Sequence, residues 1–287
     1  MIAGWKYGKN YTQIKERWCK DIENEKTRYS YSRTTSFHNC KYEYYLNYVV
    51  NDDDLYFSEG NYYAEFGSYI HEILAMIFEK ELKPEDALDY FIDNYDDRIY
   101  YKVRKSTMEK NLAIMSDYFA TLDISWIDNY EILGVEKEVE FTVNGLPFIG
   151  FIDLLLRDKK DGRIVILDHK SAEYPFKKDG TLKKKEEKSF NGYKKQMYLY
   201  SHAIYQLYGE FPKEMTWNLF KDGGKFATIP FIKETYNETM IWFDDVIKEI
   251  EKEIEFEPNE DFFYCTNLCN FRNSCEYRLM SIRGSDV

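Results

Sequence analysis

Two aspartates and a lysine interrupt the most apolar stretch of the sequence. Residues 150–171 read GFIDLLLRDKKDGRIVILDHKS, a pattern that predicts two β-strands joined by a tight turn. Asp153 and Asp168 lie inside the apolar runs, and Lys170 follows closely. A buried strand tolerates such groups only where they are paired or bind a metal, because an isolated buried charge is costly. These three residues are therefore the first candidates for chemistry.

Strand periodicity places the charged groups on one face of this hairpin. Asp168 and Lys170 are two residues apart and share a face, whereas the side chain of His169 points the other way. Asp161–Gly162 is a typical two-residue hairpin turn. Counting outward from this turn puts Asp153 opposite Lys170, with Asp168 as its diagonal neighbour. Two carboxylates and one ammonium group would then meet at one place.

The residues alone leave two explanations for this arrangement. A salt bridge from Lys170 to one aspartate would leave the second carboxylate without a partner. Two convergent carboxylates are what a hard cation such as Mg²⁺ needs, with waters completing its coordination. A neighbouring lysine could orient or deprotonate a metal-bound water and balance charge on an attacked phosphate. The spacing favours the metal site.

The order FID and then DHK resembles the signature of the PD-(D/E)XK nuclease superfamily, with Ile152 in the place of the proline. Two further motifs resemble its RecB-like branch. GSYIH, Gly67–His71, is similar to the G-x-x-x-H helix, whose histidine is a metal ligand and whose glycine would let another backbone approach. QMYLY, Gln196–Tyr200, is similar to the Q-x-x-x-Y motif, whose amide and phenol could contact DNA or the carboxylates.

Both motifs also have a purely structural explanation. A lone helix histidine such as His71 is more often hydrogen-bonded in a core, and Tyr200 could pack beside Met197 and Ile204 at helical spacing. Gln196 is harder to explain by packing. The neighbouring carboxylates make His71 the preferred metal ligand.

Three cysteines near the C-terminus, Cys265, Cys269 and Cys275, follow the pattern C-x₃-C-x₅-C, and Cys40 lies far upstream. This set resembles the iron–sulfur staple of AddB-type nucleases and CRISPR-associated RecB-like exonucleases, which have one early and three late cysteines on a 4Fe–4S cluster. The first gap is one residue longer than in the usual tail. A four-cysteine zinc site is the alternative metal site. If no metal is bound, the cysteines are unrelated thiols buried in the core. Cys19 has no assigned role.

The resemblance implies a Mg²⁺- or Mn²⁺-dependent deoxyribonuclease, with exonuclease activity favoured over endonuclease activity. His71, Asp153 and Asp168 would bind the metal together with the backbone carbonyl of His169. Lys170 would position the attacking water. Gln196 and Tyr200 complete the implied catalytic site.

The sequence has no G-x-x-x-x-G-K-[ST] motif and thus no helicase P-loop. We therefore expect action on single strands or free DNA ends, with a separate helicase, annealing or CRISPR adaptation protein as partner. Recombination, repair, phage replication and CRISPR spacer acquisition all fit. The alternative is a non-catalytic nucleic-acid-binding or assembly subunit with the same fold, against which the intact aspartates and lysine argue.

Hydrophobic periodicity predicts the elements that position these residues. A helix over residues 62–82 carries G-x-x-x-H, and a helix over 193–209 carries Q-x-x-x-Y and ends at Gly209, a residue typical of C-caps. Further helices are predicted from about Thr34–Ser36 to residue 50, between about 84 and 130, and through about Glu255, with strands over 131–170, 214–221 and 226–231.

This order predicts a mixed α/β fold. The resemblance implies a central mixed β-sheet flanked by helices, as in restriction endonucleases, with helical N- and C-terminal parts joined by the metal-cluster staple. The expected limits are an N-terminal extension (1–30), a helical region with Cys40 and G-x-x-x-H (31–130), the nuclease core (131–232), and a C-terminal helix with the cysteine cluster (233–287).

A net charge of −12 excludes a general nucleic-acid-binding coat but leaves room for a local basic groove. Residues 177–188, KKDGTLKKKEEK, with Lys194 and Lys195, follow the D-x-K strand, and we expect phosphate contacts there; a solvated loop is the alternative. No apolar run could span a bilayer and no signal peptide is recognisable, which predicts a cytoplasmic protein without membrane association. Five cysteines in that compartment favour metal binding over disulfides.

Overall fold

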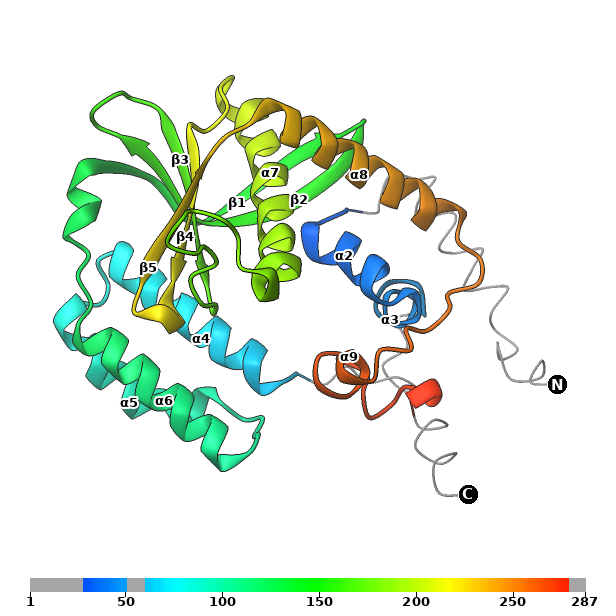
Figure 1. Ribbon diagram of the computed structural model, residues 1–287, viewed down its shortest axis with the longest axis horizontal. Helices are drawn as coiled ribbons and strands as arrows, with labels where there is room; N and C mark the ends of the chain where they lie inside the picture. Colours follow the sequence, from blue (N-terminus) through cyan, green and yellow to red (C-terminus); the bar gives the residue numbers. More distant parts are fainter. Residues whose placement is uncertain (1–27, 51–59, 279–287) are drawn as a thin grey trace. The chain divides into compact units, whose positions relative to one another are not determined.

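The computed structural model of the protein describes residues 28–50 and 60–278 (Figure 1). Cys19 and residues 1–27 of the expected N-terminal extension lie outside the described residues. The chain divides into two compact units. The cysteine unit comprises Met1–Gly60, Thr142–Ile149 and Ile241–Val287, and the sheet unit comprises Asn61–Phe141 and Gly150–Met240. The domain limits inferred from the sequence stay a prediction.

A five-stranded mixed β-sheet organises the fold. Its strands lie in chain order, with β3 parallel to β4 and with antiparallel pairs β2–β3 and β4–β5. The strands are β1 (Tyr130–Val143), β2 (Leu146–Asp158), β3 (Ile164–Lys170), β4 (Glu214–Leu219) and β5 (Lys225–Pro230). The expected mixed sheet with flanking helices is confirmed.

Helix α7 (Glu187–Tyr208) is the crossover that two parallel strands, β3 and β4, require. It ends at Gly209, whose φ of +75° is a left-handed conformation that glycine adopts without strain, so the C-cap prediction is confirmed. Phe190 of α7 packs against Trp217 of β4, which stands beside Asp168 in the sheet. The face of the sheet that carries Asp168 is thus the face that α7 covers.

Three helices share a second core with the sheet: α4 (Tyr62–Phe78), α5 (Ala87–Arg98) and α6 (Lys105–Ala120). Leu154 and Leu167 belong to this core. His169 follows Leu167 by two residues and points the same way, stacking on Phe78 of α4 at 5.9 Å between ring centroids. Its orientation away from Asp168 is confirmed.

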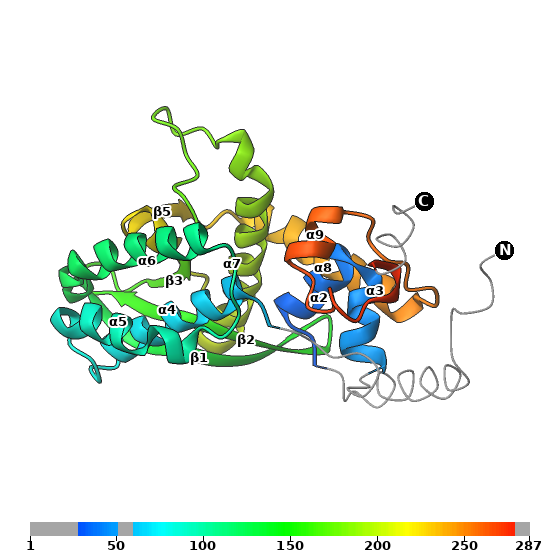
Figure 2. The same cartoon turned by 90° about the horizontal axis from the view of Figure 1, so that it is seen from below.

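The remaining described elements are short or belong at least partly to the cysteine unit (Figures 1 and 2). They are the helices α2 (Tyr31–Asn39), α3 (Lys41–Tyr44), α8 (Lys233–Lys252) and α9 (Phe262–Asn267), the π-helix η1 (Tyr45–Val50), and the 3₁₀ turns η2 (Pro84–Asp86), η3 (Ser125–Asn129), η4 (Lys184–Glu186) and η5 (Phe220–Asp222). None of the helices in the described residues is long and apolar enough to cross a membrane.

Two local predictions are wrong. The β2–β3 connection is not a two-residue Asp161–Gly162 turn, because Asp158 N–H bonds the carbonyl of Arg163 at 2.9 Å and closes a wider loop. The strand register, Leu154 opposite Leu167, is therefore shifted by two residues from the expected one. A shift of two residues keeps every side chain on its face. The charged residues therefore still share one face of the sheet, although the predicted register is wrong.

The start of α2 also differs from the prediction near Thr34–Ser36. The helix begins at Tyr31, since the Ser30 hydroxyl accepts a hydrogen bond from the backbone N–H of Arg33 at 3.1 Å. Serine is a favoured N-cap because its oxygen satisfies one of the free N–H groups of the first turn.

Candidate functional site

The β2–β3 ladder ends at the candidate site. Its last paired residues are Leu154 and Leu167. Asp153 Oδ2 then accepts a hydrogen bond from the backbone N–H of His169 at 2.6 Å, so a carboxylate takes over from the strand's own carbonyl. Continuing the register by one residue places Asp153 opposite Asp168, and not opposite Lys170 as predicted.

Asp168 is buried and bound by one ammonium group. Lys170 Nζ donates a hydrogen bond to Asp168 Oδ1 at 2.8 Å and lies 2.8 Å from Oδ2. Within the described residues Oδ2 receives no well-aligned hydrogen bond, although it is fully buried. A buried carboxylate oxygen in this condition needs a further partner. A cation between Asp168 and Asp153 would be such a partner.

His71, Glu136 and Asp153 form a group whose ligand atoms all lie within 4.8 Å of one another. His71 Nδ1 lies 3.4 Å from Asp153 Oδ2 and 3.8 Å from Glu136 Oε1. One imidazole and two carboxylates on three different elements, α4, β1 and β2, are a donor set that a divalent metal can use. The structure therefore brings the predicted ligands His71 and Asp153 together.

Glu136 was missed by sequence reasoning. It has a φ of +42°, which is unusual for a residue other than glycine and costs energy. Such strain persists where the surrounding structure fixes it, often at a functional site. Two residues earlier, a Cβ on Gly134 would lie 2.8 Å from the Lys137 side chain, so the backbone here leaves little room for any residue but glycine. Glycine inside a predicted strand was the available signal, since it often marks a bulge.

The electrostatics of the cluster show a shortage of positive charge. The pKa of the Asp153 carboxyl is raised to about 7, first by burial and then by the charge of Asp168. Burial lowers the pKa of His71, but its contact with Glu136 and the charge of Asp153 outweigh this, so the pKa is raised overall. Both groups hold protons more tightly than usual, Asp153 because it is buried and lies beside Asp168, and His71 because carboxylates surround it. A divalent cation would relieve the same crowding, so the donors fit a divalent metal.

The Q-x-x-x-Y residues face this cluster from α7. Gln196 Nε2 donates a hydrogen bond to the Tyr200 hydroxyl at 3.1 Å. Burial raises the pKa of Tyr200 to about 12; the charge of Asp168 also raises it, whereas the hydrogen bond from Gln196 and the charge of Lys170 lower it. A Cβ on Gly150 would lie 2.6 Å from the Tyr200 ring, so glycine is needed there for the ring to occupy this place.

Tyr193 is a second residue that sequence reasoning missed. Its ring centroid lies 5.5 Å from Lys170 Nζ, within reach of a cation–π interaction. It precedes Gln196 by three residues and therefore shares the same helix face. That spacing was the available signal. Tyr193 thus brings an aromatic ring from α7 to the ammonium group of Lys170.

Gly67 does not have the role predicted for it. Among the residues that the structure describes, nothing lies within 4 Å of a Cβ built at this position, so no second backbone from this part of the chain approaches. Gly67 instead borders an open hollow of about 500 Å³ beside His71. The hollow is lined by Tyr63, Ala64, Gly67, Ser68, His71, Glu72 and Glu136.

The lysine-rich residues 177–188 extend from the loop after β3 into the first turn of α7 (Figure 2). Lys183 Nζ donates to the backbone carbonyl of Tyr174 at 2.6 Å, and Lys185 Nζ lies 2.6 Å from Glu173 Oε2. Lys183 and Lys185 therefore stabilise the loop through contacts with residues of its first part. Phosphate contact by this segment stays a prediction.

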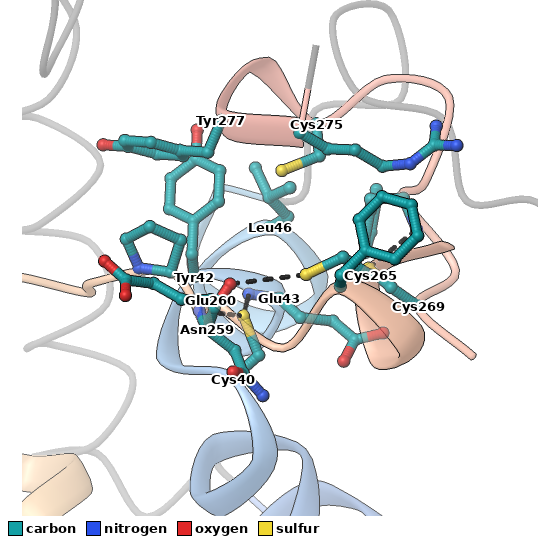
Figure 3. A pocket seen from close by; sticks show the side chains of 14 residues that line it. Cys40, Tyr42, Glu43, Leu46, Asn259, Glu260, Cys265, Cys269, Cys275 and Tyr277 are labelled. Carbon is teal, nitrogen blue, oxygen red and sulfur yellow. Dashed lines mark hydrogen bonds between the residues drawn. The ribbon is translucent and has the colours of Figure 1, made fainter. Parts of the chain in front are cut away.

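The four candidate cluster cysteines line one pocket of about 400 Å³ in the cysteine unit. In Figure 3 the sulfur atoms of Cys40, Cys265 and Cys275 point into the same space. Cys40 precedes α3, and Cys265 lies on α9, with Cys269 and Cys275 in the turns that follow. All four are free thiols. The structure therefore brings together residues from the two ends of the described chain.

Backbone groups already surround these sulfur atoms. Cys40 Sγ accepts hydrogen bonds from the N–H groups of Glu43 at 3.4 Å and Asn259 at 3.3 Å, and Cys269 Sγ accepts one from Phe271 at 3.4 Å. Burial raises the pKa of each of the four thiols. Thiols in such a place ionise only when a metal compensates their charge.

Comparisons with known proteins agree with this geometry. A family model for the PD-(D/E)XK nuclease superfamily matches residues 28–276. No curated protein matches the sequence significantly. Among solved structures, a crystal structure from Eubacterium rectale, described as "Putative exonuclease", is similar with a TM-score of 0.51 and 14% identity, over 96% of this chain and 92% of that chain. At this identity the similarity is one of fold.

The geometry of Glu136 generates a prediction about metal binding. Glu136→Gln should weaken the affinity of the metal-free protein for Mn²⁺ by about tenfold or more, because it removes one charged donor of the group. Titration calorimetry at constant pH measures this. Glu138→Gln is the matched control, since Glu138 is an exposed acid two residues along the same strand. Equal affinities for both variants would remove Glu136 from the donor set.

Proposed function

Since the chain belongs to the PD-(D/E)XK nuclease superfamily, whose members use divalent metal ions, we propose that it is a Mg²⁺- or Mn²⁺-dependent deoxyribonuclease. We assign it to the RecB-like branch on its G-x-x-x-H and Q-x-x-x-Y motifs, and we infer exonuclease action on single strands or free ends. The observation that carries the proposal is the meeting of His71, Asp153 and Asp168 beside Lys170.

His71, Asp153 and Asp168 would hold the metal, with the backbone carbonyl of His169 and the carboxylate of Glu136 as further donors. When bound, the metal would polarise the phosphate and lower the pKa of a bound water. The buried Asp168 Oδ2, which receives no well-aligned hydrogen bond, and the pKa of Asp153, raised by burial and by the charge of Asp168, support this donor set, because a bound cation would stabilise both carboxylates.

Lys170 acts as a fixed positive charge in this proposal. Burial lowers its pKa, but Asp168 and Asp153 outweigh the burial and raise the pKa above its usual value. The side chain therefore stays protonated and serves as a hydrogen-bond donor to the attacking water or to a phosphate oxygen, and not as a base. Tyr193 packs on the ammonium group and limits where it can point.

Tyr200 also stays protonated at neutral pH, since its pKa is about 12. Gln196 donates to its oxygen, which leaves the hydroxyl proton free to be donated to the substrate or to a carboxylate. The amide thus orients the phenol, and the phenol orients the substrate.

We propose an iron–sulfur cluster as the occupant of the cysteine pocket. A single zinc ion bound by four thiolates at about 2.3 Å fills little more than its own coordination sphere. The pocket, with a volume of about 400 Å³, has room for a polynuclear cluster, and the choice of a cluster over zinc rests on the resemblance of the cysteine pattern. The N–H groups directed at Cys40 and Cys269 are of the kind that stabilise cluster thiolates. The cluster would supply a structural staple between α3 and the C-terminal segment.

The partner we propose is DNA with a free end, delivered by a separate helicase, annealing or CRISPR adaptation protein. The sequence has no P-loop with which to unwind DNA itself. The proposed biological settings are recombination, repair, phage replication and CRISPR-type DNA processing.

Nuclease activity is tested first. Asp153→Ala, Asp168→Ala and Lys170→Ala should each lower cleavage of end-labelled linear DNA in Mg²⁺ or Mn²⁺ by about 100-fold or more, because the first two remove donors to the metal and the third removes the positive charge at the reacting phosphate. Lys160→Ala is the matched control, as an exposed lysine of the same hairpin. Full activity in any of the three variants, or no cleavage by the wild-type protein, contradicts the proposal.

The role of Tyr193 is tested by two substitutions. Tyr193→Leu should reduce the maximal cleavage rate by about fivefold, because Lys170 loses its cation–π partner. Tyr193→Phe keeps an aromatic ring and should retain the rate. If both variants lose activity equally, or neither does, the ring does not position Lys170.

The cysteine pocket is tested by metal content and stability. Cys40→Ala should lower the melting temperature and the soluble yield, because a shared cluster joins distant parts of the chain and its binding free energy stabilises the fold. Cys19→Ala should change neither. Anaerobically purified wild-type protein should contain about four irons per chain and absorb broadly near ~400 nm. If the protein contains one zinc and no iron per chain, the staple is a zinc site and the cluster proposal is wrong. If it contains no metal, both proposals are wrong.

A further inference from the structure

An exposed aromatic ring stands at the far end of the hollow that leads to His71. Tyr63 lies in the first turn of α4 and is 44% exposed, although its neighbours Tyr62 and Phe66 are buried. It lines the same hollow of about 500 Å³ as His71. Between them Gly67 leaves open space, since a Cβ there would meet nothing within 4 Å. A chain-like ligand could therefore lie against α4 from His71 to Tyr63.

A lysine from another element stands beside this ring. Lys221 Nζ lies 5.8 Å from the ring centroid of Tyr63 and 5.7 Å from that of Phe66. Lys221 belongs to η5, which directly follows β4. Leu219, the last residue of β4, is paired with Lys170. Lys221 and the candidate metal site thus lie at the same edge of the sheet.

In the part of the chain that the structure describes, no acidic side chain balances the charge of this lysine. Within residues 28–50 and 60–278, no carboxylate forms an ion pair with Lys221 or with Lys110 of α6. Burial and the nearby charge of Lys110 lower the pKa of Lys221. Two like charges on neighbouring elements, one of them half-buried, are stabilised when an anion binds between or beside them. Phosphate is the anion that a nuclease meets.

We propose that Tyr63 and Lys221, with Lys110 beside them, form a nucleotide subsite for single-stranded DNA. The base stacks on the ring of Tyr63, and a phosphate of the same strand binds Lys221. Tyr63 precedes His71 by eight residues of α4, a distance of about 12 Å along the helix axis. The subsite therefore holds a nucleotide away from the scissile phosphate. The inference rests on the proposed nuclease function, which supplies DNA as the ligand and the direction in which the strand continues.

Binding measurements in EDTA test the subsite without any need for cleavage. The probe is a fluorescent oligothymidylate, followed by anisotropy. Tyr63→Leu should weaken binding by about fivefold or more, because stacking on an aromatic side chain contributes that much per base. Tyr63→Phe should bind like the wild-type protein. Tyr100→Leu is the matched control, because Tyr100 is 74% exposed elsewhere in the sheet unit, and it should leave affinity unchanged.

An abasic oligonucleotide of the same length separates stacking from a structural role. The wild-type protein should bind it about fivefold or more weakly than oligothymidylate, and Tyr63→Leu should bind both probes alike. Melting temperatures of all variants check that each is folded. If Tyr63→Leu still distinguishes the two probes as the wild-type protein does, no base stacks on Tyr63 and the subsite is wrong.

The phosphate contact has its own readout. Lys221→Met should reduce the slope of log affinity against log salt by about 0.7, the contribution of one phosphate on a single strand. Lys105→Met, on an exposed part of α6, should keep the slope. An unchanged slope for Lys221→Met overturns the phosphate contact. All binding is measured without cleavage, so the two proposals fail separately. A protein that shows these binding effects but does not cleave DNA would overturn only the nuclease proposal. A protein that cleaves DNA but lacks the binding effects would overturn only the subsite.

Discussion

The candidate site depends on two carboxylates, those of Asp153 and Asp168, which are buried at the end of the β2–β3 pair. Burying one charged carboxylate is costly, and burying two side by side is costlier still. The protein reduces this cost with three cationic or donor groups: the backbone N–H of His169 on Asp153, the ammonium group of Lys170 on Asp168, and the imidazole of His71. The compensation is incomplete, as the raised pKa of Asp153 and the unsatisfied oxygen of Asp168 indicate. A bound cation is the partner that would complete it.

The cysteine unit also contains a buried carboxylate, that of Glu43, beside groups that could bind a metal. Glu43 is buried next to the four thiols, and it is tied to the C-terminal segment by the hydroxyl of Tyr264 and by the N–H of Asn270 at 3.1 Å. These bonds join α3 to residues distant in sequence without any metal. They also place a negative charge beside thiols that would have to ionise to bind one. Four thiolates already outweigh the positive charge of a zinc ion or a 4Fe–4S core, so the hydroxyl and N–H donors bound to Glu43 would offset the negative charge that its carboxylate adds beside the site.

The sequence predicted those parts of the site that depend on local periodicity. The faces of β3 follow from alternation, so Asp168 and His169 were assigned correctly even though the register was wrong by two residues. Gly209 ends α7 for a local reason and was also predicted. Glu136, Tyr193 and Tyr63 were missed because their importance comes from what other elements bring near them. Gly134 and the spacing of Tyr193 from Gln196 were local signals, but neither indicates a role at the site. That role depends on tertiary features: the strained backbone of Glu136, the ammonium group near Tyr193 and the lysine beside Tyr63.

The most direct test of the central claim is the position of a metal ion. Crystals of the protein soaked in Mn²⁺ give an anomalous signal that locates the ion independently of activity. The account predicts a peak about 2.0–2.3 Å from a nitrogen of His71 and from carboxylate oxygens of Asp153 and Asp168. A well-ordered site without such a peak at saturating Mn²⁺, or an ion bound only elsewhere in the sheet unit, would contradict it.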